Sequence, residues 1–212
     1  PYFRKMRRLQ TLCFCLTECF QLIPMKLSFS FLFVFLLAVL SGNVLAHPVP
    51  DVPVRTVFES GEARISVEVD IRCFAEDPES EPYLQNWVLK ESTAEEKEEY
   101  KRKASELVDS TIRFFLQPVG RVQPEFVFSF TGKNGAKLEK TEDPVVLTGT
   151  ATLGIPEGSN GYKIEADKSG QFSVVFLNTV DGKEVERIAV LFPGEKSFVL
   201  DVTEIDRNDA AD

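Results

Sequence analysis

The chain has 212 residues, with 33 acidic residues against 24 lysines and arginines, and its formal net charge is −9. An acidic surface repels phosphate backbones and anionic lipid headgroups, which excludes nucleic-acid binding through a basic patch. The length suits one domain of ordinary size behind a targeting segment.

The N-terminal part of the sequence predicts an export signal. A short basic start at Met25-Lys26 precedes an apolar run over residues 27–40 and small residues up to Ala46, which is the order of a secretory signal peptide. The run is shorter than the about 20 apolar residues that a spanning helix needs. We therefore expect cleavage near Ala46/His47 and a periplasmic or extracellular product. An uncleaved membrane anchor is the alternative.

The remaining boundaries follow from this signal. Residues 1–24 are interpreted as an over-extended gene model or a long n-region. The signal peptide covers 25–46, a single domain covers 47–204, and 205–212 form a polar tail. The chain from His47 onward holds 19 basic and 32 acidic residues and no second cysteine beside Cys73. An intramolecular disulfide is therefore impossible, and stability must come from a hydrophobic core.

The start of the domain carries a strand pattern. Apolar and polar residues alternate through 62–74, which is typical of a half-buried strand in an antiparallel sheet. The apolar members are Ile65, Val67, Val69, Ile71 and Cys73, and the polar members are Glu68, Asp70 and Arg72. Ser60-Gly61 predicts a hairpin turn between this strand and a preceding one over 54–60.

A helical segment at about 82–117 is expected to interrupt the strands. Ser92 and Glu95 have the spacing of a capping box, and Thr93 with Glu96 repeats it one residue later. We expect a short helix over 83–91 and a strong helix over 92–117. Because apolar residues recur on one face of the second helix, we expect it to pack on a sheet or cover a sheet edge.

The second half of the domain returns to short strands. Turn residues separate them, and Asn134-Gly135 is the strongest turn signal among them. Strands at intervals of 8 to 12 residues favour a sandwich. We therefore expect a mainly β protein, an antiparallel β-sandwich of immunoglobulin-like architecture with an inserted helical segment.

His47 is a weak candidate for a metal site. After cleavage, its α-amino group and its imidazole could bind one copper ion together. Pro48 has no amide hydrogen to give up, however, and the chain beyond Ala46 offers no second histidine and no methionine. We expect no dedicated metal site and no cofactor.

Two further groups of residues could support catalysis. Glu68 and Asp70 lie about 7 Å apart on one face of their strand, and paired carboxylates hydrolyse glycosides. On an acidic protein such a pair is more often the solvated side of a sheet. Cys73 has no histidine nearby to act as its base, and a free cysteine is usually a small core residue.

Two loops offer weaker signals. Arg121 lies between Pro118 and Pro124, in a segment expected to be a rigid loop, and is a weak candidate for a partner contact. The alternative is a surface arginine paired with a carboxylate. The acidic stretch 76–81 could bind Ca²⁺, but it lacks the order of an EF-hand and is interpreted as a flexible loop.

Part of the chain also resembles a known kind of protein. An uncharacterised bacterial exported β-sandwich domain is similar to three stretches here, AHPVPDVPVRT, PVGRVQPEF and RIAVLFPGEKSFVLDVT. That domain is loosely associated with membrane proteins of the hydrogenase- and urease-accessory type. The resemblance carries no catalytic motif and implies no site residues. Since no membrane segment follows the signal, it implies a separate membrane partner.

These observations predict an exported, non-enzymatic binding or accessory domain that contacts a protein partner at the cell envelope. Sheet edges and the helical segment are the expected contact surfaces. The alternatives are a secreted hydrolase that uses the carboxylate pair and an envelope metal-handling protein that uses His47.

Overall fold

The computed structural model describes residues 50–203. The expected signal peptide, His47 and the polar tail lie outside this range. Within it, no helix combines the length and the apolar character that crossing a membrane requires.

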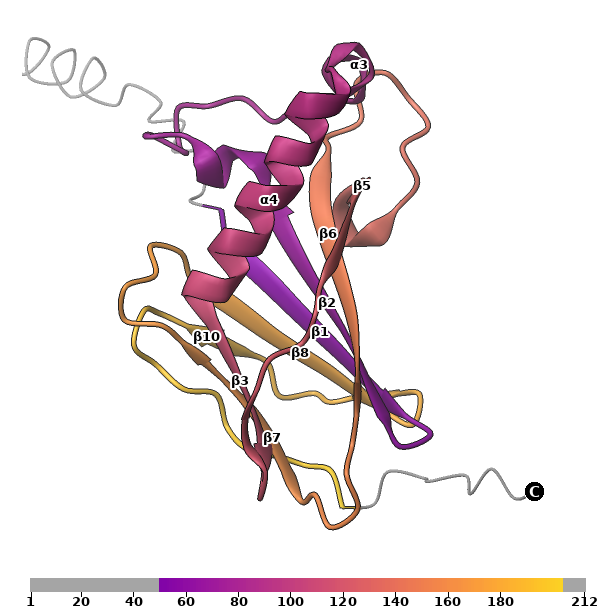
Figure 1. Cartoon of the computed structure of the whole chain (residues 1–212), viewed down its shortest axis with the longest axis vertical. Coiled ribbons are helices and arrows are strands. Elements are labelled where there is room, and N and C mark those ends of the chain that lie inside the picture. Colours follow the sequence, from indigo (N-terminus) through magenta and orange to yellow (C-terminus); the bar gives the residue numbers. More distant parts are fainter. Residues whose placement is uncertain (1–49, 204–212) are drawn as a thin grey trace, which may run out of the picture. The chain divides into compact units, whose positions relative to one another are not determined.

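The larger of two sheets has the strand order β10-β8-β1-β2-β6-β5, and β9 also pairs with β8 (Figure 1). Its strands are β1 (Val52–Glu59), β2 (Glu62–Asp70), β5 (Val127–Thr131), β6 (Val146–Gly154), β8 (Val174–Val180), β9 (Lys183–Glu184) and β10 (Ala189–Leu191). All neighbours are antiparallel except β1 and β8, which pair in parallel. The expectation of an antiparallel arrangement is wrong at this one pair, because the long connection between these strands permits a parallel crossover.

The smaller sheet is antiparallel throughout, with the order β11-β7-β3-β4. Its strands are β3 (Ile112–Gln117), β4 (Gly120–Val122), β7 (Gly161–Ala166) and β11 (Leu200–Asp201). Two sheets and few helical residues confirm the expected mainly β class.

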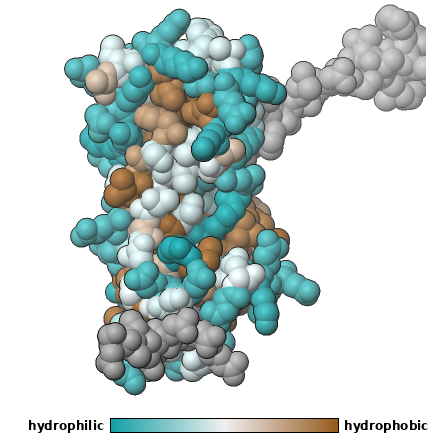
Figure 2. Space-filling model, turned by 90° about the vertical axis from the view of Figure 1, so that its right-hand side faces the viewer, coloured by the Kyte–Doolittle hydropathy of each residue, from teal (hydrophilic) through white to brown (hydrophobic). Residues whose placement is uncertain are grey.

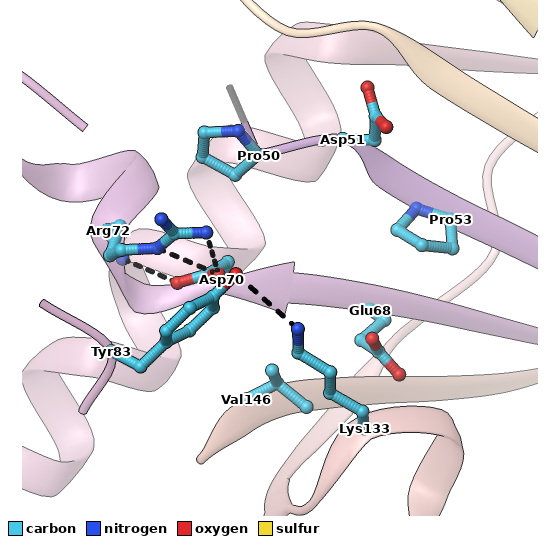
Figure 3. A pocket seen from close by; sticks show the side chains of 9 residues that line it. All are labelled: Pro50, Asp51, Pro53, Glu68, Asp70, Arg72, Tyr83, Lys133 and Val146. Carbon is cyan, nitrogen blue, oxygen red and sulfur yellow. Dashed lines mark hydrogen bonds and ion pairs between the residues drawn. The ribbon is translucent and has the colours of Figure 1, made fainter. Parts of the chain in front are cut away.

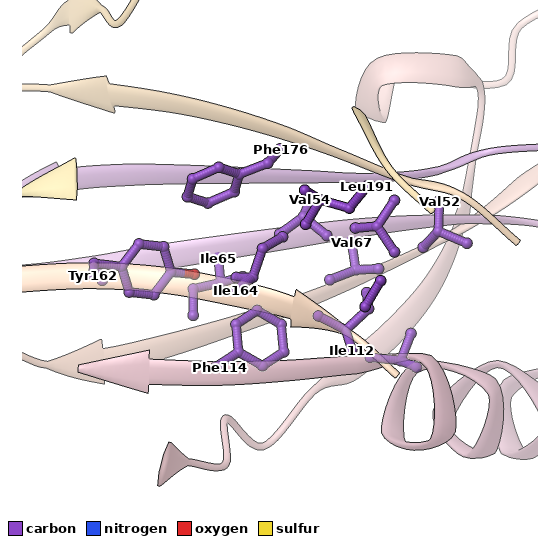
Figure 4. Close-up of a cluster of buried hydrophobic side chains, with 14 of the residues drawn as sticks. Val52, Val54, Ile65, Val67, Ile112, Phe114, Tyr162, Ile164, Phe176 and Leu191 are labelled. Atoms are coloured by element: carbon purple, nitrogen blue, oxygen red, sulfur yellow. The ribbon is translucent and has the colours of Figure 1, made fainter. Parts of the chain in front are cut away.

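A hydrophobic core lies where the inner faces of both sheets meet (Figure 4). Tyr162 of β7 is fully buried there, with its ring centroid 5.1 Å from that of Phe58 and 5.8 Å from that of Phe176. Its hydroxyl forms a 3.1 Å hydrogen bond with the hydroxyl of Thr56. One side chain therefore links both sheets by packing and by a satisfied polar contact.

The β1–β2 hairpin forms as the sequence predicts. Ser60 and Gly61 both have positive φ, 53° and 73°, and Glu59 faces Glu62 across the turn. Two successive left-handed residues match the twist of the adjoining strands, so the glycine is needed at this position.

The helical segment contains α3 (Asn86–Glu91) and α4 (Ala94–Thr111). Of the two expected capping boxes, the structure forms the second. The Thr93 hydroxyl accepts a hydrogen bond from the Glu96 backbone N–H at 3.2 Å, and the Glu96 carboxylate accepts one from the Thr93 backbone N–H at 2.8 Å. The hydroxyl of Ser92 instead donates to the Val88 carbonyl of α3.

We expect Thr93→Ala to lower the free energy of unfolding by about 1 kcal/mol, because the Glu96 backbone N–H loses the hydroxyl that accepts its hydrogen bond. Ser92→Ala is the matched control and should cost clearly less. Urea denaturation of both variants followed by circular dichroism measures the difference. Equal losses would show that the cap at Thr93 does not stabilise α4.

The helix is shorter than expected. It ends at Thr111, and Ile112–Gln117 form strand β3 without an intervening turn. The sequence IRFFLQ carries β-branched and aromatic residues, and it pairs with β7 from Ile112↔Ala166 to Gln117↔Gly161. Phe115 therefore belongs to a strand, and the expected helical face stops one turn before it.

Helix α4 extends the layer that the smaller sheet begins. Ala104 and Val108 are buried, and the helix contacts β5, β6 and β3. The Tyr100 ring packs 6.4 Å from Phe74 and 6.5 Å from Phe130. The expectation that the helical segment packs its apolar side on a sheet is confirmed.

Candidate functional site

The polar side of β2 is buried at Glu68 and Asp70, which corrects the sequence-based expectation of a solvated carboxylate pair. Glu68 is 9% exposed and Asp70 is 8% exposed, although both point away from the core. The turn η2 (Lys133–Gly135) lies against Glu68, and the side chain of Arg72 lies against Asp70. Both carboxylates are therefore held inside a site and do not form a wet sheet surface.

Asp70 ends strand β2 and begins the short turn η1 (Ile71–Phe74). Its Oδ1 accepts a hydrogen bond from the Arg72 backbone N–H at 3.0 Å. Its Oδ2 accepts two more from the same residue, from Nε at 3.1 Å and from Nη2 at 2.9 Å. The pair is buried, with 3% of the Arg72 side chain and 11% of the Asp70 side chain exposed.

One nitrogen of the Arg72 guanidinium does not bond to Asp70. The hydrogen bond with Asp70 raises the pKa of Arg72 above its ordinary value, so the group stays charged. Its Nη1 points away from the carboxylate, is buried, and has no hydrogen-bond partner among residues 50–203. A buried donor without an acceptor costs about 1–3 kcal/mol, more for a charged group.

Two cationic side chains lie against the aromatic ring of Tyr83 (Figure 3). The Arg72 Cζ lies 3.8 Å from the ring centroid, and the Lys133 Nζ lies 4.5 Å from it. The same ammonium is 3.5 Å from the Tyr83 hydroxyl. Within residues 50–203, no carboxylate lies close enough to Lys133 to form an ion pair, so its charge is balanced only by the aromatic ring and solvent.

The turn that carries Lys133 is fixed by Glu68. The Glu68 carboxylate accepts a 2.6 Å hydrogen bond from the Asn134 backbone N–H, and Arg55 lies 4.0 Å from the same carboxylate. Arg55 also donates to the Asn134 side-chain oxygen. Asn134 has a φ of 59°, which asparagine tolerates better than most residues. The Asn-Gly turn signal is thus confirmed, and it positions a cation.

These residues enclose a pocket of about 210 Å³ on the outer side of the larger sheet. We call it the charged pocket, and it is lined by Pro50, Asp51, Pro53, Glu68, Asp70, Arg72, Tyr83, Lys133 and Val146. In Figure 3, Arg72 lies on one side of the pocket, and Asp51 and Glu68 lie on the other. The sequence showed the carboxylates of β2, but not that Tyr83 and Lys133 join them.

Cys73 is buried, as expected, although it lies in η1 and not on the strand. Burial raises the pKa of its thiol to about 12. The thiolate is the reactive form, so a thiol in this environment is a poor nucleophile at neutral pH. This arrangement supports the core role and not the catalytic one.

We expect stability to fall with pH because of Cys73. The thiol pKa is higher in the folded state than its ordinary value of 9.0, so this contribution is complete below pH 9 and is lost as the pH rises towards about 12. At pH 10 the loss is on the order of 1 kcal/mol. Urea denaturation at pH 8 and pH 10 measures it, and Cys73→Ala should show a smaller decrease. Equal decreases would refute the assignment.

Arg121 lies in a different place from the one expected. It is an exposed residue of strand β4, paired with Phe115, and not part of a loop. No carboxylate of the described residues forms an ion pair with it. It does not line the charged pocket, so the structure does not bring it together with Glu68 and Asp70.

The described residues form no site that would support the metal hypotheses. Among residues 50–203, no three side chains of histidine, cysteine, aspartate or glutamate are grouped to hold an ion, and this range includes the acidic stretch 76–81. His47 itself lies outside the described part of the chain.

A second surface lies on the outer side of the larger sheet, over β1, β8 and β10. The strand register aligns Pro53, Val175 and Val190 across three strands. Ile188 and Val190 are 59% and 51% exposed. We call this surface the outer apolar face, and it comprises Pro53, Val57, Val175, Leu177, Ile188 and Val190.

A groove of about 430 Å³ deepens this face beside β9. Its apolar walls come from Val57, Leu177, Val185 and Ile188. Glu184 and Glu186 also line it, with Arg55 as the one basic lining residue among those described. Strand β10 is an edge strand, with β8 as its one neighbour in the sheet. An exposed apolar groove beside an open sheet edge can accept a further strand.

The side of the molecule that carries β5 and β6 looks different. Figure 2 shows a mixture of hydrophilic and intermediate side chains over most of it, with hydrophobic groups near its upper end and at its lower right. Single exposed apolar residues are normal on a soluble domain, whereas a contiguous apolar strip marks a contact site.

Comparison with known proteins gives no relative. No family model matches the chain, and the search of curated proteins finds no match either.

Proposed function

We propose that the protein is an exported binding domain that attaches to a protein partner at the cell envelope and has no catalytic role. The two sheets are proposed to be the layers of an immunoglobulin-like sandwich. The observation that carries the proposal is the outer apolar face with its groove, beside an edge strand that has one free side.

The partner is proposed to present an extended apolar segment with basic flanks. Ile188 and Val190 supply the apolar contact, and β10 supplies the backbone edge for strand addition. Residues 50–203 hold 28 acidic and 18 basic side chains, and Glu184 and Glu186 are at the groove. A basic flank is therefore attracted, while a second acidic copy of the chain is repelled.

The hydrolase alternative has one observation in its favour, since Glu68 and Asp70 line the same pocket. Glycoside hydrolysis needs one carboxyl to deliver a proton and the other to act on water or sugar. Here Asp70 accepts three hydrogen bonds from Arg72, and Glu68 accepts one from the Asn134 backbone. Both carboxylates stabilise the structure around the pocket, and Asp70 is fully paired with Arg72, which supports the binding function.

A photo-crosslinking amino acid at position 190 tests the proposal in the native host. We expect one adduct with a second protein at Val190 and none at Thr152, an exposed position on the outer side of β6 that serves as the matched control. Val190→Glu combined with Ile188→Glu should abolish association with that protein, because burying a carboxylate is costly.

Three results would overturn the proposal. Equal adducts at Val190 and Thr152 would show that the outer apolar face is not the contact surface. An adduct of twice the chain mass would make it a self-association surface. Retained association in the double glutamate variant would place the contact elsewhere on the molecule.

A further inference from the structure

The charged pocket contains hydrogen-bond donors of two cationic side chains that the proposed protein contact does not use. Within residues 50–203, Arg72 Nη1 is a buried donor without an acceptor, on a side chain that is only 3% exposed. Lys133 is an exposed ammonium without a carboxylate partner among residues 50–203, and it lines the same pocket. Both cations lie against the Tyr83 ring, which positions the guanidinium and the ammonium before a ligand binds.

These donors match an oxyanion. A guanidinium edge and an ammonium are the groups that proteins use to bind a carboxylate or a phosphate, and their charge-assisted hydrogen bonds are the strong ones. An oxygen from such a ligand would supply the acceptor that Nη1 lacks. The Tyr83 hydroxyl lies beside Lys133 and offers a third polar contact.

The rest of the pocket restricts the kind of anion. Asp51, Glu68 and Asp70 also line it, so its five charged groups carry a net charge of −1. Asp70 is matched by Arg72, and Asp51 accepts a hydrogen bond from Ser173. A dianion such as phosphate would meet repulsion from these carboxylates and from the acidic surface.

A ligand that also carries a positive charge avoids this repulsion. Arg72 lies on one side of the pocket, and Asp51 and Glu68 lie on the other (Figure 3), so the site has a positive and a negative end. The volume of about 210 Å³ is below that of pockets for drug-sized molecules and suits a ligand of a few heavy atoms.

We propose that the charged pocket binds a small zwitterion of the amino-acid type, with its carboxylate at Arg72 and Lys133 and its ammonium at Glu68 and Asp51. This site meets the outer apolar face only at Pro53, and it does not depend on the proposed protein partner.

Titration of ¹⁵N-labelled protein, purified from its expression host, tests the proposal by NMR. The probes are glycine, β-alanine and 4-aminobutyrate, which differ in the spacing of their charges. Acetate, methylammonium and inorganic phosphate are the single-sign controls. We expect one zwitterion to shift the amide signals of Tyr83 and Asn134 saturably, with a Kd at least tenfold below those of all three controls.

Two substitutions locate the ligand. Lys133→Met removes an exposed cation that makes no ion pair within residues 50–203, and it should weaken binding about tenfold or more. Lys137→Met is the matched control, because this lysine is equally exposed, follows in the same loop and does not line the pocket. Arg72→Lys keeps the charge beside Asp70 but loses Nη1, and it should weaken binding to a similar extent.

The outcomes separate clearly. Saturable zwitterion binding that Lys133→Met weakens and Lys137→Met leaves unchanged supports the site. Acetate or phosphate that binds as tightly as every zwitterion overturns the proposed ligand class. The absence of saturable shifts with any zwitterion, or equal binding by Lys133→Met and the original protein, overturns the site itself. If Arg72→Lys does not fold, the comparison of Lys133→Met with Lys137→Met still tests the site.

Discussion

Arg72→Met is expected to destabilise the fold by about 3–5 kcal/mol, since it leaves the Asp70 carboxylate buried without its cation. Asp70 is 8% exposed, and Arg72 supplies all three hydrogen bonds described for it. The substitution removes two of these bonds and leaves only the backbone N–H. Urea denaturation gives the loss as a shift in the transition midpoint at constant slope.

The pair can be separated from its surroundings with a double-mutant cycle. Asp70→Asn should also be strongly destabilising, and the double variant should lose clearly less than the sum of the two single losses. Arg102→Met is the control, because Arg102 bonds to Glu99 and Glu106 on the exposed side of α4, and no measurable change is expected there. Additive losses at Asp70 and Arg72 would show that the two residues act independently.

The second large effect is expected at the centre of the core. Tyr162→Ala should lower the free energy of unfolding by about 3–5 kcal/mol, because it opens a cavity between both sheets. The side chain is fully buried and touches the rings of Phe58 and Phe176. Denaturant unfolding followed by circular dichroism measures the loss.

A smaller substitution divides this effect into its parts. Tyr162→Phe keeps the ring and leaves the Thr56 hydroxyl without its partner, which should cost about 1–3 kcal/mol. Trp87→Ala, at a position that is 45% exposed, should cost far less than Tyr162→Ala despite the larger side chain. Similar losses for Trp87→Ala and Tyr162→Ala would contradict the assignment of Tyr162 to the core.

Much of the β architecture could be predicted because its signals are local. The alternation through β2 and the turn at Ser60 and Gly61 act within a few residues of one another, and both appear in the structure. The predicted strand runs to residue 74, however, whereas β2 ends at Asp70 and the chain continues as η1. The capping box is equally local. Ser92 and Thr93 present the same pattern, however, and only the break between α3 and α4 decides that Thr93 is the cap.

The end of α4 could not be predicted in the same way. Phe115 continues the helical spacing from Thr111, while Ile112, Phe114 and Leu116 fit a period of two equally well. What decides is the pairing of this segment with β7, about 50 residues later in the chain. The parallel contact between β1 and β8 is likewise a long-range choice that no local pattern encodes.

The candidate site was only partly visible for the same reason. Glu68, Asp70 and Arg72 form an obvious polar series in the sequence, although Arg72 lies in η1 and not on β2. Their burial, however, depends on Tyr83 and Lys133, which come from two other segments. The Asn-Gly turn beside Lys133 marked a bend, and nothing in the sequence linked that bend to β2.

The direct passage from α4 into β3 has a consequence for how the chain tolerates change. Thr111 is the last helical residue and Ile112 the first of the strand, so no loop absorbs an error in phase. One inserted residue would turn the helix by about 100° or exchange the two faces of the strand, and either change removes one apolar side from the core. Two inserted residues would return the apolar side chains of β3 to the core face but shift its register with β7 by two residues. The junction thus sets the rotational phase of the helix and the register of the strand together, which makes it a site of low tolerance for insertions.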